Sequence, residues 1–141
     1  MVADIFIQDA PVKLDVNTLR DNLNTEGCGA IVPFVGITRE MDDGEEVLAL
    51  EFDSWQEKLG ETLRKIAENA KTKFQIKSIA MSHRTGRVGP QENIVAIFVA
   101  SPHRKDAFES CSWLIDELKR QAPLWKKEIK PSGSTWKAGL G

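Results

Sequence analysis

The stretch NIVAIFVA, at residues 93–100, decides the fold class, because every residue after its asparagine is apolar. A strand with one face in water alternates polar and apolar residues, whereas a strand covered on both faces is apolar throughout. We therefore expect residues 93–100 to form a strand with other elements packed on both of its faces.

Helices are predicted on both sides of this strand in the chain. Residues 54–57 read S-x-x-E, a capping-box pattern, and open a helix whose apolar positions are Leu59, Leu63, Ile66, Ala67 and Ala70. A helix over residues 102–121 is indicated by a stripe of Ala107, Phe108, Cys111, Leu114, Ile115 and Leu118. A short helix, with Asp15 as its N-cap, carries Val16, Leu19 and Leu23.

The segment 28–40 is apolar and rich in β-branched residues, which predicts a long strand. It contains Pro33 and Gly36, so we expect this strand to be bulged or to lie at a sheet edge. The acidic loop at residues 40–46 then returns into the apolar residues 47–52. This arrangement predicts a hairpin between the two apolar segments.

Two more strands complete the order of elements. Residues 2–9 alternate, residues 73–83 are apolar in two phases, and a Gly/Pro turn follows at residues 84–92. The order favours an α+β fold, in which helices pack against a mixed sheet. We expect one domain spanning residues 1–141.

Composition argues against two classes of partner. The chain has 141 residues, with 19 Lys and Arg against 21 Asp and Glu, so its formal net charge is −2. Nucleic-acid binding normally requires a basic excess, so no nucleic-acid partner is expected. There is no signal segment and no apolar run near the roughly 18 residues that span a bilayer. We expect no membrane association and a cytoplasmic location.

The two cysteines, Cys28 and Cys111, lie far apart in unlike contexts. This spacing indicates neither a redox pair nor a zinc site. We expect two reduced thiols, with no metal and no cofactor.

His103 and Arg104 stand at the predicted start of the last helix, just after Pro102. Proline suits the first turn of a helix, whose free N–H groups already present positive potential. A phosphate would bind favourably there, and the arginine would add donors. The alternative is that both side chains bend into solvent or pair with acidic neighbours.

The segment LKRQAPLWKKEIK, at residues 118–130, places two lysines beside apolar surface. Lys119 falls on the flank of the apolar stripe, so its stem is expected to run along buried surface. Pro123 should end the helix just before it, which allows Lys126 to return toward Lys119 from the next segment. Alternatively, Lys119 and Arg120 only offset the negative end of the helix dipole.

Four segments together resemble the catalytic (large) subunit of molybdopterin synthase: FVGITR (34–39), SPHRKDAFE (101–109), LKRQAPLWKKE (118–128) and TW (135–136). The resemblance extends over about residues 28–137, and its motifs are specific in their order and spacing. It implies an α/β-hammerhead-like mixed sheet with an additional antiparallel sheet. It also implies an enzyme, a sulfurtransferase that converts cyclic pyranopterin monophosphate (precursor Z) into molybdopterin by inserting two sulfurs as a dithiolene.

Roles for individual residues follow from the same resemblance. Lys119 and Lys126 match the catalytic lysines of the family. Its substrate-binding positions correspond to Ile37, Thr38, Arg39, His103, Arg104, Lys127 and Glu128. The residues alone leave the direction of the lysine pKa shifts open, because burial lowers the pKa of an ammonium and nearby anions raise it.

The resemblance further implies a partner. In the family, sulfur arrives as a thiocarboxylate on the C-terminal Gly-Gly of a small ubiquitin-like subunit, and two large subunits form the central homodimer of a heterotetramer. The residues are consistent with this chemistry, since no His or Lys motif adjoins either cysteine and sulfur must come from outside. A thiocarboxylate and the phosphate of a pterin substrate are both anions, which basic side chains would attract.

Some features fit the resemblance less directly. The acidic loop at residues 40–46 is unusual beside an anion site, so we expect it to fold away from the site or to be mobile. His83, Arg84 and Arg87 flank a turn, where a structural role is favoured over substrate contact. The rival interpretation of the whole chain is a non-catalytic module that binds an acidic peptide tail or a nucleotide phosphate through the same basic residues.

Overall fold

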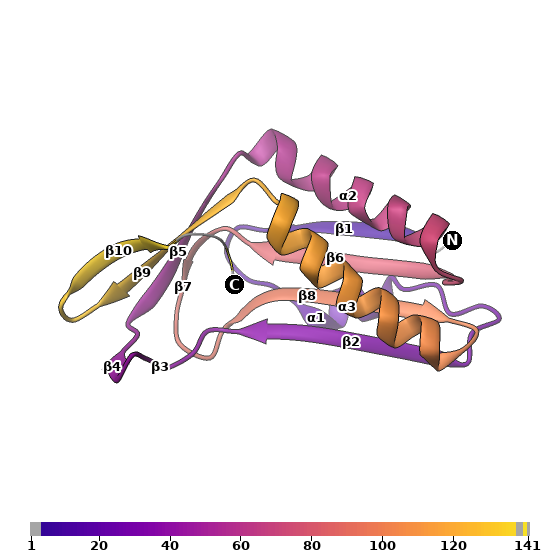
Figure 1. The fold of residues 1–141 in the computed structure, drawn as a ribbon, viewed down its shortest axis with the longest axis horizontal. Helices are drawn as coiled ribbons and strands as arrows, with labels where there is room; N and C mark the ends of the chain where they lie inside the picture. The colour runs from indigo at the N-terminus through magenta and orange to yellow at the C-terminus, as the bar shows by residue number, and fades with distance from the viewer. Residues whose placement is uncertain (1–3, 138–139, 141) are drawn as a thin grey trace.

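A computed structural model describes residues 4–137 and residue 140 of the chain. Its larger sheet has four strands in the order β1-β6-β8-β2 (Figure 1). Their bounds are Ile5–Ala10 for β1, Ser78–Arg84 for β6, Asn93–Ser101 for β8 and Ala30–Ile37 for β2. β1 runs parallel to β6, whereas β8 is antiparallel to both of its neighbours, so the sheet is mixed as expected.

Strand β8 is covered on both faces, as the sequence predicts. Val95, Ile97 and Val99 belong to one buried cluster, and the alternating residues Ala96 and Phe98 belong to another. The first cluster lies under α2 (Gln56–Lys73) and α3 (Arg104–Gln121), and the second lies against α1 (Val16–Asp21) (Figure 1). Helices on opposite sides of the sheet therefore explain why the strand has no polar face.

Helix α2 buries all five of its predicted apolar residues, but it does not begin as predicted. Ser54 is the last residue of a strand, and the N-cap of α2 is Trp55, which makes no side-chain capping hydrogen bond. The capping-box prediction is wrong because the strand extends over the serine. At α1 the N-cap prediction is confirmed, since the carboxylate of Asp15 accepts a hydrogen bond from the N–H of Asn17 at 2.9 Å.

Helix α3 begins two residues later than expected. His103 is its N-cap and Arg104 its first residue, so Pro102 lies outside the first turn. The stripe is confirmed at its buried positions, but Phe108 is 62% exposed and does not belong to it. The helix ends at Gln121, before Pro123, as the sequence predicts.

A second, antiparallel sheet has the order β10-β9-β5-β7. Its strands are β10 (Gly133–Lys137), β9 (Leu124–Lys130), β5 (Ala49–Ser54) and β7 (Gly86–Val88). A separate two-stranded hairpin consists of β3 (Met41–Asp42) and β4 (Glu45–Glu46). Residues 84–92, predicted as a turn, thus contain a short strand that pairs with β5.

The predicted hairpin between the segments 28–40 and 47–52 is wrong. Strand β2 pairs with β8 in one sheet, and β5 pairs with β9 and β7 in the other. The acidic segment between them closes its own hairpin, which leaves each apolar strand free to join a different sheet. The prediction for β2 itself is confirmed, because it is an edge strand with a register irregularity between Gly36 and Ile37.

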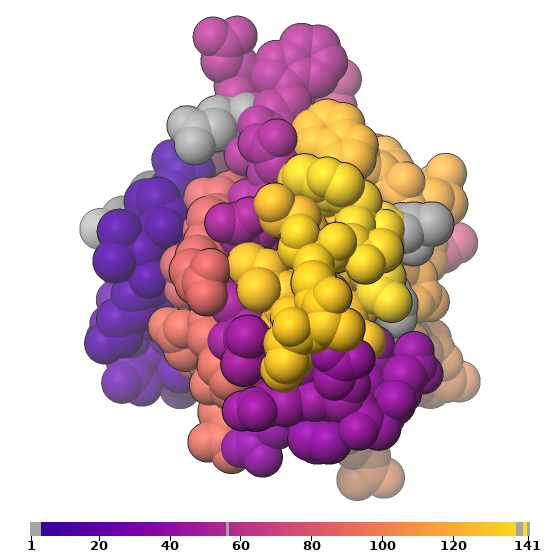
Figure 2. Space-filling view, turned by 90° about the vertical axis from the view of Figure 1, so that its left-hand side faces the viewer, coloured from indigo at the N-terminus to yellow at the C-terminus, as the bar shows by residue number. Residues whose placement is uncertain are grey.

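The β9–β10 hairpin lies beside the segment that follows β2. Figure 2 shows this end of the molecule, with the hairpin in yellow next to the purple segment. The N–H of Leu48 donates to the carbonyl of Ile129 at 2.8 Å, and Lys130 pairs with Asp42 at 3.0 Å.

Within the described residues, no helix is long and apolar enough to cross a membrane.

Candidate active site

A cavity of about 420 Å³ opens between the two sheets, beside the C-terminal end of α3. Its apolar lining comes from both sheets and from α3, and includes Phe34, Leu50, Phe52, Val95, Ile115 and Leu118. Its charged lining consists of Arg39, Asp42, Asp43, Lys119, Lys126, Glu128 and Lys137. The described wall therefore combines four basic and three acidic side chains with an apolar floor.

The break in α3 brings the two predicted catalytic lysines to this cavity. Lys119 lies in the last turn of α3, and Pro123 then turns the chain into β9. Successive residues of a strand face opposite sides, so Lys126 and Glu128 point into the cavity and Lys127 points out. The prediction that Lys126 returns toward Lys119 from a neighbouring segment is confirmed by their shared cavity.

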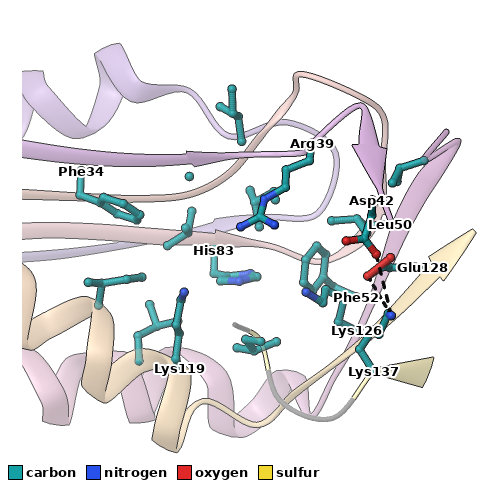
Figure 3. A pocket seen from close by; sticks show the side chains of 18 of the residues that line it. Phe34, Arg39, Asp42, Leu50, Phe52, His83, Lys119, Lys126, Glu128 and Lys137 are labelled. Carbon is teal, nitrogen blue, oxygen red and sulfur yellow. Dashed lines mark ion pairs between the residues drawn. The ribbon is translucent and has the colours of Figure 1, made fainter. Parts of the chain in front are cut away.

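Arg39 reaches the cavity from the other side. It follows the irregular end of β2, where Ile37 also lines the cavity. Figure 3 shows Arg39 and Lys119 on opposite walls, each pointing into the space between them. Thr38, between Ile37 and Arg39, is buried beside the strand, and its hydroxyl has no hydrogen-bond partner among the described residues.

Burial and crowding by like charges set the protonation of Lys126. Burial lowers the pKa of its ammonium most strongly, and Lys119, Lys137 and Arg39 lower it further. The carboxylate of Glu128 opposes these effects. The net direction is down, so the structure answers the question that the sequence leaves open for this lysine. A lysine with a lowered pKa donates and accepts protons more readily near neutral pH.

The acidic loop does not fold away from the site. Asp42 and Asp43 line the cavity, and the carboxylate of Asp42 pairs with Lys130 at 3.0 Å and Lys137 at 4.0 Å. The hydrogen bond from Lys130 is the main reason that the pKa of Asp42 is lowered. The expectation that the loop folds away from the site is wrong, because Lys130 and Lys137 of the β9–β10 hairpin pair with Asp42 at the rim. Figure 3 shows Asp42 and Lys137 at this rim.

Glu128 also lines the cavity and is only 8% exposed. Its carboxylate lies 3.5 Å from the ammonium of Lys137 and 3.6 Å from that of Lys130. Two lysines therefore compensate a carboxylate whose burial would otherwise be costly.

His83 is a cavity residue that the sequence assigned to a structural role. Its side chain is 4% exposed and packs edge-on against Phe52, with ring centroids 4.9 Å apart. Its Nδ1–H donates to the carbonyl of Arg84 at 2.7 Å. Burial lowers the pKa of His83 to about 4, so the ring is neutral at neutral pH. The structural role of Arg84 is confirmed, since its guanidinium donates to the carbonyls of Ala10 and Arg87.

Three predicted site residues lie elsewhere in this chain. His103 and Arg104 are exposed at the start of α3, whose 18 residues span about 27 Å, so the length of the helix separates them from Lys119. Lys127 faces outward, where it pairs with Glu51 at 3.1 Å and lies over the ring of Trp136. One protomer thus assembles Ile37, Arg39, Lys119, Lys126 and Glu128 in one cavity, whereas His103, Arg104, Lys127 and the buried Thr38 do not line it.

Four cavity residues were not predicted from the sequence: Lys137, Asp42, Phe34 and Phe52. Lys137 reaches the cavity because it lies directly opposite Lys126 in the antiparallel register of β9 and β10. Residues 133–137, GSTWK, contain one apolar side chain and show no alternation that would have predicted this strand. Nothing local marked Phe34 or Phe52, because their positions depend on how the two sheets meet.

These features define an α+β protein with a partly enclosed, basic cavity that suits a small anionic ligand. No group of three or more His, Cys, Asp and Glu side chains in residues 4–137 and 140 is placed to hold a metal ion.

Comparisons with known proteins identify the family. The model of the MoaE protein family matches residues 7–121. Molybdopterin synthase catalytic subunit 1 of Aedes aegypti is 41% identical over 129 residues, which cover 89% of this chain and 83% of that protein. The crystal structure of molybdopterin synthase from Staphylococcus aureus superposes with a TM-score of 0.88 at 30% identity, covering 93% of this chain and 96% of that one.

A complex of subunits 1 and 2 of molybdopterin-converting factor from Helicobacter pylori also matches, with a TM-score of 0.72 at 26% identity over 95% of this chain and 90% of that one. The chain belongs to the MoaE protein family.

Proposed function

We propose that this chain is the catalytic subunit of a molybdopterin synthase. In this role it converts cyclic pyranopterin monophosphate into molybdopterin by inserting two sulfur atoms to form the dithiolene. Membership of the MoaE family supports the assignment. The observation that carries it is the convergence of Arg39, Lys119 and Lys126 on one partly apolar cavity, from three separate segments of the chain.

The sulfur comes from a partner in this proposal. Burial raises the pKa of Cys111 to about 11 and also raises the pKa of Cys28, so neither thiol is activated as a nucleophile. The donor is then the C-terminal thiocarboxylate of a small sulfur-carrier subunit, whose Gly-Gly tail enters the cavity. The relative from Helicobacter pylori, a complex of two subunits, supports such an assembly.

Lys119 and Lys126 take the catalytic roles. The thiocarboxylate sulfur bonds to a side-chain carbon of the pterin and displaces an oxygen substituent from that carbon, which leaves the two molecules joined by a thioester. Water then cleaves the bond between the acyl carbon and sulfur, so the sulfur stays on the pterin and the small subunit leaves as its carboxylate. Lys119 stabilises the negative charge that moves in these steps and transfers a proton, and Lys126, whose pKa is lowered, assists it. Arg39 holds the substrate phosphate or pterin at the facing wall, while Ile37 and Glu128 shape the pocket.

His103 and Arg104 can bind the substrate of this reaction only if the cavity of one chain is completed by residues of a second chain. They are exposed at the start of α3, where helix N–H groups favour an anion. In a homodimer of large subunits, this end of one chain would reach the cavity of its partner and hold the substrate phosphate there. We propose that the chain acts as one domain in such a dimer, within a heterotetramer. Thr38 would then position Arg39, and Lys127 would support the rim from outside.

The experiment that tests the function mixes the purified chain with cyclic pyranopterin monophosphate and a thiocarboxylated small subunit. Mass spectrometry of the pterin should show a product that carries two sulfur atoms. A non-catalytic binding module would retain the small subunit on a column but yield no dithiolene, and that outcome would refute the proposal.

A further inference from the structure

We propose that Lys137 is a positioning residue for Lys126: its ammonium, held at the cavity rim by Glu128 and Asp42, makes it harder for Lys126 to remain protonated. The inference rests on the proposed function, in which Lys126 takes part in proton transfer. It adds to that function a residue whose contribution acts through a neighbour and not through the reacting atoms.

The register of the β9–β10 hairpin brings the two lysines together. Lys137 lies directly opposite Lys126 in the antiparallel pair, and both side chains line the cavity. The Cβ atoms of residues directly opposite each other are about 5 Å apart, and like charges at such positions repel. The repulsion is stronger beside the apolar wall of the cavity than it would be in water.

Two carboxylates hold Lys137 in this unfavourable place. Its ammonium lies 3.5 Å from Glu128 and 4.0 Å from Asp42. Glu128 also attracts Lys126 and raises its pKa, so the carboxylate that holds Lys137 in place also stabilises the charged form of Lys126. Lys137 therefore opposes the stabilisation that Glu128 gives to the charged form of Lys126.

The remaining groups around Lys126 do not reverse this effect. Lys119 of α3 and Arg39 of the segment after β2 add like charge, and His83 of β6 is neutral at neutral pH. Asp43 lines the same cavity as a further acid at the rim. The pKa of Lys126 is lowered first by its burial, and Lys137 is one of three cations that lower it further.

The control residue for this proposal is Lys130. It pairs with the same two carboxylates, at 3.0 Å from Asp42 and 3.6 Å from Glu128. It lies four residues beyond Lys126 along β9 and is not one of the residues that line the cavity. Removing Lys130 therefore removes the same kind of ion pair without removing the charge opposite Lys126.

The experiment measures the titration of Lys126 directly. The intact chain is labelled with a trace of acetic anhydride at a series of pH values, and mass spectrometry reports the reactivity of Lys126. In Lys137→Met the titration should move to higher pH, and in Lys137→Glu it should move further. Lys137→Arg should titrate as the unchanged chain does, and Lys130→Met should shift by less than Lys137→Met. Circular dichroism confirms that each variant is folded.

Two results would overturn the inference: an unchanged titration of Lys126 in Lys137→Met and Lys137→Glu, or an equal shift in Lys130→Met. The labelling requires neither the pterin nor the small subunit, so its outcome is separate from that of the product assay. Turnover can be measured as a function of pH as well. In Lys137→Met, the part of the pH–rate profile that follows the ionisation of Lys126 should move to higher pH. A merely structural role for Lys137 would lower the rate without moving that part of the profile.

Discussion

Single residues reach the cavity by two routes, through a break in one helix or through contacts between distant segments. Lys119 and Lys126 flank a proline that ends a helix, and that break is sufficient to turn the second lysine back toward the first. Asp42 and His83 depend on contacts with distant segments. Their place in the cavity results from ion pairs and packing between segments more than 30 residues apart, which no local pattern records.

The buried His83 makes the stability of the protein depend on pH. Its pKa is lowered from 6.5 to about 4 in the folded chain, so below pH 6.5 the unfolded chain binds a proton that the folded chain does not. The stability that the neutral ring contributes is present above pH 6.5 and is lost as the pH falls to about 4. Between pH 7.5 and pH 5 this should cost about 2 kcal/mol.

Urea unfolding of the chain and of His83→Gln at both pH values measures this cost. The variant is expected to be less stable at pH 7.5 but to lose less stability on acidification. His103→Gln serves as the control, because His103 is the only other histidine of the sequence and is exposed. A pH dependence that is identical in the chain and in His83→Gln would contradict this account.

Elements were predicted more reliably than their pairing. Helices α2 and α3 and strand β8 follow from apolar spacing within one segment. The choice of strand partners does not, because β2 and β5 are neighbours in sequence and yet join different sheets. The capping box at Ser54 failed for a related reason, since pairing with β9 keeps that serine in a strand.

The two predicted caps should therefore differ in their effect on stability. Asp15→Ala removes the carboxylate that accepts a hydrogen bond from the N–H of Asn17, and it should lower the free energy of unfolding by about 1 kcal/mol. Ser54→Ala removes a hydroxyl that caps no helix, and the change should stay within about 0.5 kcal/mol. Chemical denaturation measures both variants, and a larger loss in Ser54→Ala would show that the serine does cap α2.

At the scale of the whole molecule, the two ends of α3 carry basic residues that one chain cannot bring together. The sequence motifs contain both ends, because a motif records which residues serve a site and not which protomer supplies them. The proposed homodimer would reconcile the motifs with the geometry, because Lys119 would act in its own cavity and Arg104 in the cavity of the partner.

Mixed dimers test this arrangement. When cavities are shared between protomers, a dimer of one Lys119→Ala chain and one Arg104→Ala chain has one cavity with both changes and one with neither. If cavities are shared between protomers, random mixing gives half mixed dimers, each with one intact cavity of two, and about a quarter of the original activity should return. If each cavity uses only its own chain, every cavity lacks one residue, and activity should remain at the level of the single variants.

The most direct test of the central claim, that the basic cavity is where sulfur is inserted, is a comparison of two lysine variants in one assay. Each is mixed with cyclic pyranopterin monophosphate and the thiocarboxylated small subunit, and the dithiolene product is measured by mass spectrometry over time. Lys119→Ala should lower the rate by at least about 100-fold. Lys65→Ala, which removes an exposed lysine of α2, should leave it unchanged. Product formation by Lys119→Ala at the rate of the unchanged chain would contradict the account.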